Sequence, residues 1–245
     1  MRVKISGGMQ AGKTEELLEL LAGSPLFRGA DTAELEAALD VARQVEVARG
    51  EFLFLQGEPA IAFYILVEGR VRMSQVTPEG HQVIIYFMGP ADGIGLIVAL
   101  SNTTYPLAAE AVSDSLALKW DYDSTIRLME QHPRLALSGL RLVGERFREL
   151  QNRYRELATE RVERRVARAL LRLTRQTGKR VEEGVLLDLP LSRQDLGEMT
   201  GTTLYTVSRI LSNWENEGLI RKGRERIIVR EPHRLVIIAE DLPDS

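Results

Sequence analysis

Residues 192–218 constrain the fold more than any other part of this chain, because they carry the pattern of two short helices joined by a tight turn. The first helix is predicted to begin at Ser192, with Asp195 three residues further on in the spacing of a capping box. Gly201 follows this helix, and a glycine there lets the backbone turn in a left-handed conformation. The segment therefore predicts a helix-turn-helix.

The second predicted helix has one apolar face and one polar face. Its inner face runs through Val207, Ile210, Leu211 and Trp214 at helical spacing. The opposite face carries hydroxyl groups and a cation, Arg209. An arginine there can donate two hydrogen bonds to O6 and N7 of a guanine in the major groove. Taken together, these features favour double-stranded DNA as the partner over an ordinary helical hairpin.

Basic residues are concentrated in the C-terminal third of the chain. Residues 161–231 contain 15 lysines and arginines against 10 acidic residues, whereas the remaining residues contain 17 against 25. The overall net charge of −3 hides this asymmetry. Part of the basic excess lies in residues 219–231, which predict a two-stranded wing with its turn at residues 222–225. A basic segment on an acidic body suits the binding of nucleic acid.

Composition bounds the remaining possibilities. A chain of 245 residues can hold two domains with their own cores. The lack of cysteine excludes disulfides, iron–sulfur clusters held by thiolates and zinc sites built on cysteine. No metal site is expected. The sequence has no apolar run of the roughly 18 residues that a membrane helix needs. The N-terminus lacks the apolar core of a signal peptide, so we expect a cytoplasmic location.

The middle of the chain changes from helical to strand patterns and back. Residues 15–44 favour helices, and residues 50–119 contain short β-rich stretches separated by glycine and proline turns. A turn about every ten residues predicts an antiparallel roll or barrel.

A long helix is predicted to follow the strands, ending at Thr159. Apolar residues recur along it in steps of three and four, flanked by arginine and glutamate. A narrow apolar stripe on a long helix favours pairing with a second copy of itself over packing on its own domain. The predicted dimer interface consists of Leu140, Val143, Phe147, Leu150, Tyr154 and Leu157.

This order of β-roll, long helix and winged helix-turn-helix resembles the catabolite-activator and fumarate–nitrate-reduction regulator superfamily (Crp/Fnr), from about residue 20 to residue 231. The most specific motifs are QGEPAxxFYILVEGRVR in the roll and TxxTVSRILxxxExxGLI in the second helix of the helix-turn-helix. The resemblance implies an α+β fold, with an antiparallel β-roll of the cyclic-nucleotide-binding type, a dimerisation helix and a winged helix-turn-helix. It also implies a transcription regulator rather than an enzyme. Such a regulator, expected to be an activator, would bind an inverted-repeat operator as a homodimer and engage RNA polymerase.

The resemblance also assigns DNA contacts residue by residue. The family's base-reading positions correspond to Tyr205, Ser208 and Arg209, and its phosphate-contacting positions to Arg193, Gln194, Thr203 and Thr206. Tyr205 departs from the family, which usually has a glutamate there. A glutamate can accept a hydrogen bond from N4 of a cytosine, and a tyrosine at neutral pH offers no such carboxylate. We therefore expect an altered half-site at the base pair that Tyr205 faces.

The predicted effector pocket departs from the family as well. By the resemblance, cyclic-AMP receptors hold the ribose with a glutamate and the cyclic phosphate with an arginine. Leucine occupies the glutamate position here, and Pro106-Leu107 stands where Arg-Ser is expected, so no cation remains for a phosphate. Cyclic AMP is therefore not expected as the effector. The pocket residues are predicted to be Gly95, Leu96, Ile97, Pro106 and Leu107.

Other effectors stay open on the sequence alone. Haem is one, in a gas-sensing regulator of the same family. His81 or His132 would be its ligands, with Met73 or Met88 as softer alternatives. Each histidine is also explained by a position on the surface or at a helix boundary. A small apolar metabolite, or a packed pocket with no ligand, fits the apolar cassette equally well.

Residues 7–14 match the phosphate-loop pattern G-x-x-x-x-G-K-T. Such a loop needs a parallel sheet with crossover helices, and no following strand pattern supplies one. A nucleotide hydrolase is therefore the disfavoured alternative. The predicted domains are an extension over residues 1–14, expected to be disordered, the effector-type roll over 15–132, the dimerisation helix over 133–160 and the DNA-binding domain over 161–245.

Overall fold

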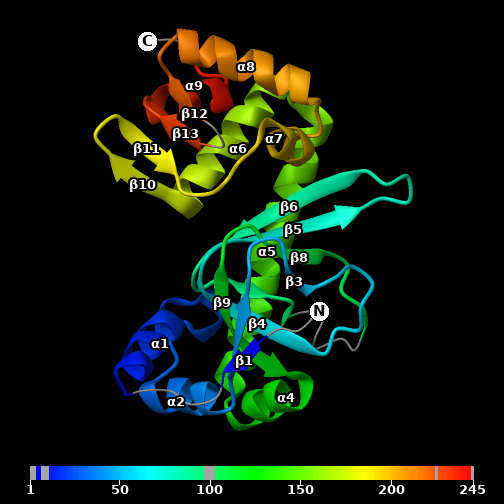
Figure 1. The fold of residues 1–245 in the computed structure, drawn as a ribbon, viewed down its shortest axis with the longest axis vertical. Helices are drawn as coiled ribbons and strands as arrows, with labels where there is room; N and C mark the ends of the chain where they lie inside the picture. Colours follow the sequence, from blue (N-terminus) through cyan, green and yellow to red (C-terminus); the bar gives the residue numbers. More distant parts are fainter. Residues whose placement is uncertain (1–3, 7–10, 97–102, 224–225, 244–245) are drawn as a thin grey trace. The chain divides into compact units, whose positions relative to one another are not determined.

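The computed structural model describes residues 4–6, 11–96, 103–223 and 226–243 (Figure 1). The chain forms two compact units. The first holds the residues through Arg148 apart from Gln82–Ile84, and the second holds those three residues and the chain from Glu149. Among the described residues, no helix combines the length and the apolar character needed to cross a membrane.

The first unit is built on two antiparallel sheets that enclose an apolar interior. In one sheet Tyr64 pairs with Lys119 on the neighbouring strand, and in the other sheet Met73 pairs with Ala109. One sheet has the order β1(Lys4–Ser6), β2(Arg43–Val47), β9(Ser115–Asp121), β4(Ala62–Glu68), β7(Gly93–Ile94). The other has the order β3(Phe52–Phe54), β8(Ala108–Ala111), β5(Val71–Val76), β6(Gln82–Met88). This arrangement is the predicted β-roll.

Helices cover the outer face of the sheet that contains β4 and β9 (Figure 1). They are α1(Ala11–Gly23), α2(Thr32–Asp40), α4(Tyr122–Gln131) and the first turns of α5(Pro133–Thr159). Trp120 is buried between the sheet and these helices, where it stacks on Phe63 and donates a hydrogen bond to the Ala38 carbonyl at 2.8 Å. Successive side chains of β4 point to opposite faces of the sheet. Phe63 therefore packs between the sheet and the helices, and Tyr64 packs in the roll interior.

The roll interior is filled by aromatic side chains near the end of β3 and the start of β4. The rings of Phe54 and Tyr105 stack with centroids 3.6 Å apart, and Tyr64 packs on Phe54 at 5.9 Å. The Tyr105 hydroxyl donates to the carbonyl of Ala62 and accepts from its N–H. Tyr105 therefore satisfies both backbone polar groups of Ala62 at the start of β4.

In the second unit the predicted wing joins a second hairpin in a single sheet, because Val185 of that hairpin pairs with Val229 of the wing. The sheet order is β10(Gly178–Val181), β11(Gly184–Leu187), β13(Arg226–Val229), β12(Ile220–Gly223). Its helices are α6(Val162–Thr177), α7(Arg193–Thr200), α8(Leu204–Asn216) and α9(Pro232–Glu240). The predicted winged helix-turn-helix consists of α7, α8 and the hairpin β12–β13. Two residues of the predicted wing turn, 224 and 225, lie outside the described residues.

The N-terminal segment differs from the extension that the sequence predicts. Residues 4–6 pair as β1 along the edge of β2, and α1 begins at Ala11 rather than after residue 14. Pairing with β2 satisfies backbone groups that a free chain end would leave to water. Residues 7–10 of the phosphate-loop match lie outside the described residues.

We expect Tyr105→Phe to lower the free energy of unfolding by about 1–3 kcal/mol, because it leaves the buried N–H and carbonyl of Ala62 without their partner. Urea denaturation followed by circular dichroism measures the change. Tyr122→Phe is the matched control, since Tyr122 is exposed, and it should change stability by less than about 0.5 kcal/mol. Equal effects of the two variants would contradict the role given to the Tyr105 hydroxyl.

Candidate nucleic-acid interface

Two local devices fix the helix-turn-helix, and both were predicted from sequence. The Ser192 hydroxyl accepts from the Asp195 N–H at 3.0 Å, and the Asp195 carboxylate accepts from the Ser192 N–H at 2.8 Å, which completes the capping box. Gly201 ends α7 in the left-handed conformation with φ of 59°. A Cβ on Gly197 would lie 2.9 Å from the Thr202 carbonyl oxygen. The absence of a side chain there lets the turn pass close to α7.

The inner face of α8 is anchored in the core of the second unit. Val207, Leu211 and Trp214 are buried together with Leu196 of α7. The Trp214 indole donates to the Glu163 carboxylate on α6 at 3.1 Å. These contacts of the inward face fix the orientation of α8 within the second unit, and with it the direction of the outward face.

The predicted base-reading residues lie on that outward face. Tyr205 is 82% exposed, Arg209 is exposed and Ser208 is half-buried. Arg209 makes no hydrogen bond or ion pair with any residue that the structure describes, so its guanidinium is available to a ligand. An exposed tyrosine beside an unengaged arginine on a rigid helix is a surface suited to the edges of bases.

The predicted phosphate-contacting residues surround the start of each helix. Thr203 caps α8 by accepting from the Thr206 N–H at 3.2 Å, and the two threonine hydroxyls lie 3.1 Å apart. Arg193 is exposed in the first turn of α7. The Gln194 side chain donates to Glu198 at 3.0 Å, so this amide must leave an existing partner before it can reach a phosphate.

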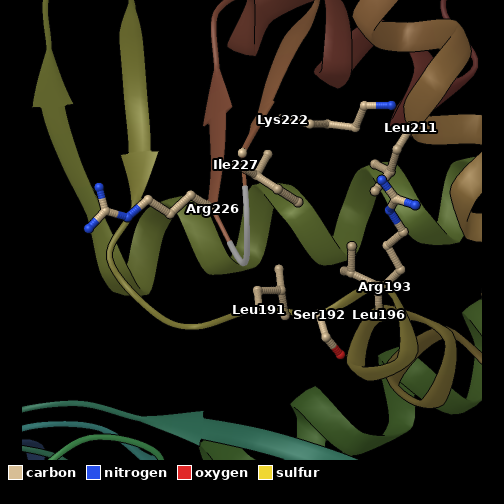
Figure 2. A pocket seen from close by; sticks show the side chains of 9 residues that line it. Leu191, Ser192, Arg193, Leu196, Leu211, Lys222, Arg226 and Ile227 are labelled. Carbon is tan, nitrogen blue, oxygen red and sulfur yellow. The ribbon is translucent and has the colours of Figure 1, made fainter.

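A cleft of about 230 Å³ separates the start of α7 from the wing (Figure 2). Its lining combines apolar side chains with three basic residues. Figure 2 shows Arg193 extending toward Leu211, whereas Arg226 points to the opposite side of the wing. Its lining residues include Leu191, Leu196, Leu211 and Ile227, with Arg193, Lys222 and Arg226.

The basic side chains of the wing differ in whether they already form an ion pair within the described chain. Lys222 is engaged by Glu215 at 2.9 Å, and the hydrogen bonds from its side chain and its backbone N–H hold the pKa of the Glu215 carboxyl below its usual range. Arg221 forms an ion pair with Glu183. Arg226 has no ion pair within the described chain. Sequence reasoning did not single out Arg226, although its place directly after the wing turn was a signal for it.

Five of the six residues of the predicted dimer stripe are exposed within their own chain, and the sixth is half-buried. Leu140 is 68% exposed and Phe147 is 60% exposed, Leu150, Tyr154 and Leu157 are also exposed, and Val143 is half-buried. Leu137 is exposed one turn earlier and extends the stripe. Leu135 and Leu142, on the other side of α5, are buried in the helical core of the first unit. The helix thus separates an internal apolar face from an external one.

The predicted effector residues that the structure describes lie in different environments. Leu96 is buried against Gly139 of α5 and Leu26. Gly95 lies close to the Tyr105 ring, Leu107 packs on the roll interior and Pro106 is exposed. Ile97 lies outside the described residues. In the part of the cassette that the structure describes, no cation is placed to bind a phosphate.

The candidate haem ligands are not brought together. His132 lies 3.8 Å from the Glu34 carboxylate, His81 is exposed in a turn, and Met73 and Met88 are buried in the roll interior. No group of three or more acidic or histidine side chains that could hold a metal ion occurs among the described residues.

A second hollow, of about 380 Å³, lies in the roll beside the aromatic side chains. Phe54, Tyr64 and Tyr105 line it, and Lys119 stands with its ammonium 6.0 Å from the centre of the Tyr64 ring. Burial raises the pKa of the Tyr64 hydroxyl, which therefore stays protonated at neutral pH. Sequence reasoning missed this hollow because its walls come from segments far apart in the chain.

Each of the two units contains a segment that matches a known protein family. The family model described as the cyclic nucleotide-binding domain matches residues 44–132, and the Crp-like helix-turn-helix domain matches residues 164–237. The chain is 30% identical to the cyclic AMP receptor protein of Thermus thermophilus, over 89% of this chain and 97% of that protein. It is 26% identical to the transcriptional activator protein anr of Pseudomonas aeruginosa, over 81% of each. The structure of FixK2 from Bradyrhizobium japonicum has a TM-score of 0.72 at 28% identity, with 84% of this chain and 98% of that chain covered.

Proposed function

The chain belongs to the Crp/Fnr family of DNA-binding transcription regulators, and from that premise we propose that it binds an inverted-repeat operator as a homodimer and activates transcription through contact with RNA polymerase. The family consists of regulators, not enzymes. The observation that carries the proposal is the outward face of α8, where Arg209 and Tyr205 are exposed on a helix fixed by the buried Trp214.

Base reading rests on the chemistry of that face. Arg209 offers two parallel N–H donors, which match O6 and N7 of a guanine. Tyr205 offers a neutral hydroxyl, which both donates and accepts, in place of a charged carboxylate, which only accepts, so the selectivity for cytosine N4 is expected to be lost. The half-site is therefore expected to keep a guanine opposite Arg209 and to differ from the family's usual half-site at the base pair opposite Tyr205.

Dimerisation rests on the exposed stripe of α5. An apolar stripe that includes Leu140, Phe147 and Tyr154 would be costly to leave in water along one helix. A second copy of the helix covers it at the spacing of a coiled coil. Two copies place two recognition helices against two half-sites, which is why the operator should be an inverted repeat.

Control by cyclic AMP is not part of the proposal, although the similar Thermus thermophilus protein is named a cyclic AMP receptor. The glutamate position is Leu96, which packs in the helical core, and the arginine position holds Pro106-Leu107. An unpaired phosphate in an apolar site is strongly disfavoured. Haem-dependent gas sensing is the alternative within the family, and no contact among the described residues favours it.

We expect Arg209→Ala to weaken binding to the selected operator by about 1–3 kcal/mol per subunit and to relax the base preference at one position of each half-site. Arg193→Ala should instead weaken binding on all sequences alike and reduce the salt slope by about 1 per subunit, because it removes a phosphate contact. Selection from random duplex DNA, followed by fluorescence anisotropy at several salt concentrations, measures both. Recovery of the family's usual half-site unchanged would contradict the role of Tyr205.

We expect Phe147→Glu to shift the protein from dimer to monomer, because a carboxylate in the stripe would have to be buried without a partner. Sedimentation equilibrium measures the association. Asn152→Glu adds the same charge on an exposed position of α5 outside the stripe, and it should leave the dimer intact. A wild-type protein that stays monomeric would refute the assignment of the stripe.

Addition of cyclic AMP should produce no binding heat in calorimetry and no change in operator affinity, because the cassette lacks both charged anchors. A saturable binding isotherm with tighter operator binding would overturn this expectation. An absorption spectrum of protein expressed with haem supply tests the alternative, since a Soret band would establish haem and its absence would remove that branch.

A further inference from the structure

Ion pairs fasten the last turns of α5 to α6 within the second unit. Arg172 of α6 donates from one nitrogen to both oxygens of Glu156, at 3.0 and 2.8 Å. The Glu156 side chain is only 9% exposed. A carboxylate buried to this degree is costly to leave unpaired, so the pair resists separation of the two helices.

Arg168, one turn earlier on α6, links the end of α5 to the C-terminal helix. It donates to Glu160 at 2.9 Å and to both oxygens of Glu240 at 2.9 and 3.2 Å. Burial by itself would lower the pKa of the Arg168 guanidinium, but the hydrogen bonds with Glu240 and Glu160 raise it. Arg168 therefore stays charged while it holds two carboxylates.

Arg165 extends the same row to the turn of the helix-turn-helix. Its guanidinium donates to the backbone carbonyls of Glu160 at 2.9 Å, Thr200 at 2.9 Å and Gly201 at 3.3 Å. The first carbonyl directly follows the end of α5, and the other two lie at the end of α7. A cation at the C-terminal ends of two helices also interacts favourably with both helix dipoles.

An apolar contact lies beside these bonds. A Cβ built on Gly201 would stand 2.9 Å from Cδ2 of Leu157, a residue of the dimer stripe. The end of the dimer helix and the turn that precedes the recognition helix are thus in contact, with Arg165 hydrogen-bonded to the backbone of both segments.

We propose that Arg165 is a positioning residue that, with the Glu156–Arg172 pair, fixes the direction of the recognition helix relative to the dimer helix and thereby selects the spacing between the two half-sites of the operator. The inference rests on the proposed function. Three hydrogen bonds occupy the Arg165 guanidinium within the second unit, so we expect it to act through the carbonyls of Thr200 and Gly201 and not by contact with a base. Its effect belongs to the geometry of the dimer and not to the reading of one half-site.

Substitution of Arg165 by methionine tests the proposal, because methionine keeps the apolar stem and removes all three hydrogen bonds. The matched control is Arg164→Met, since Arg164 lies next to Arg165 on α6 but bonds to Ala239 and Asp241 instead of α5 or the turn. Affinity is measured on duplexes with the wild-type half-sites at the preferred spacing, with one base pair more or less between them, and on a single half-site.

We expect wild type and Arg164→Met to prefer the best spacing by about tenfold or more, which is about 1.4 kcal/mol. Arg165→Met should reduce that preference to about threefold or less and leave single half-site affinity within about twofold. Arg165→Lys, which can reach one carbonyl but not three, should give an intermediate preference. An unchanged spacing preference in Arg165→Met, or equal weakening on every duplex including the single half-site, would overturn the proposal.

A second variant covers the case in which Arg165→Met does not fold. Glu156→Gln keeps the shape of the side chain and removes its charge, so it should also relax the spacing preference. Because the chain has no cysteine, spin labels can be placed on Cys substituted for Asn152 and Asn213, with unlabelled protein in excess. A broader distance distribution in Glu156→Gln than in wild type supports the proposal, and an equally narrow one opposes it. Wild type that binds no inverted repeat at all would refute the proposed function rather than the role of Arg165.

Discussion

The continuity of α5 is the constraint on which the other features depend. Its 27 residues form one helix of about 40 Å, without a proline after its first position. Each side of this helix has a different partner. Leu135 and Leu142 pack in the core of the first unit, Glu156 is buried against α6, and the stripe from Leu140 to Leu157 is exposed. The residue type at each position of α5 is therefore constrained by the partner on its own side of the helix.

The parts of the structure that sequence predicted are those set by local chemistry. The capping box at Ser192, the left-handed turn at Gly201 and the apolar periodicity of α5 each depend on residues a few positions apart. The joining of two hairpins through Val185 and Val229 was not predicted, because the pairing residues lie far apart and the hydrophobic pattern of each strand is short. The N-terminal strand was missed for the same reason, since three residues at a sheet edge carry no periodic signal.

The candidate site divides in the same way. Helical spacing placed Arg209 on the outward face of α8, the family resemblance added Tyr205, and the structure leaves both exposed. The row Arg165, Arg168 and Arg172 was counted in the sequence only as positive charge. Its partners lie on or at the ends of α5, α7 and α9. Only the folded chain therefore shows that these three guanidinium groups are hydrogen-bonded within the protein. The excess of positive charge in this third of the chain therefore overstates what is available to DNA.

Specificity for an inverted repeat has two physical sources, and they are separable in this molecule. Base identity depends on the few atoms that Arg209 and Tyr205 present to the groove. Half-site spacing depends on how rigidly α8 is held to the helix that pairs the two subunits. Hydrogen bonds to backbone carbonyls suit the control of half-site spacing, because the helix that contains a carbonyl fixes its position. A bond to a long side chain would constrain the direction of the helix less, since the side chain can move. A guanidinium bound to three carbonyls from two helix ends thus couples the directions of those helices. This coupling changes neither the bases of a half-site nor the residues that read them.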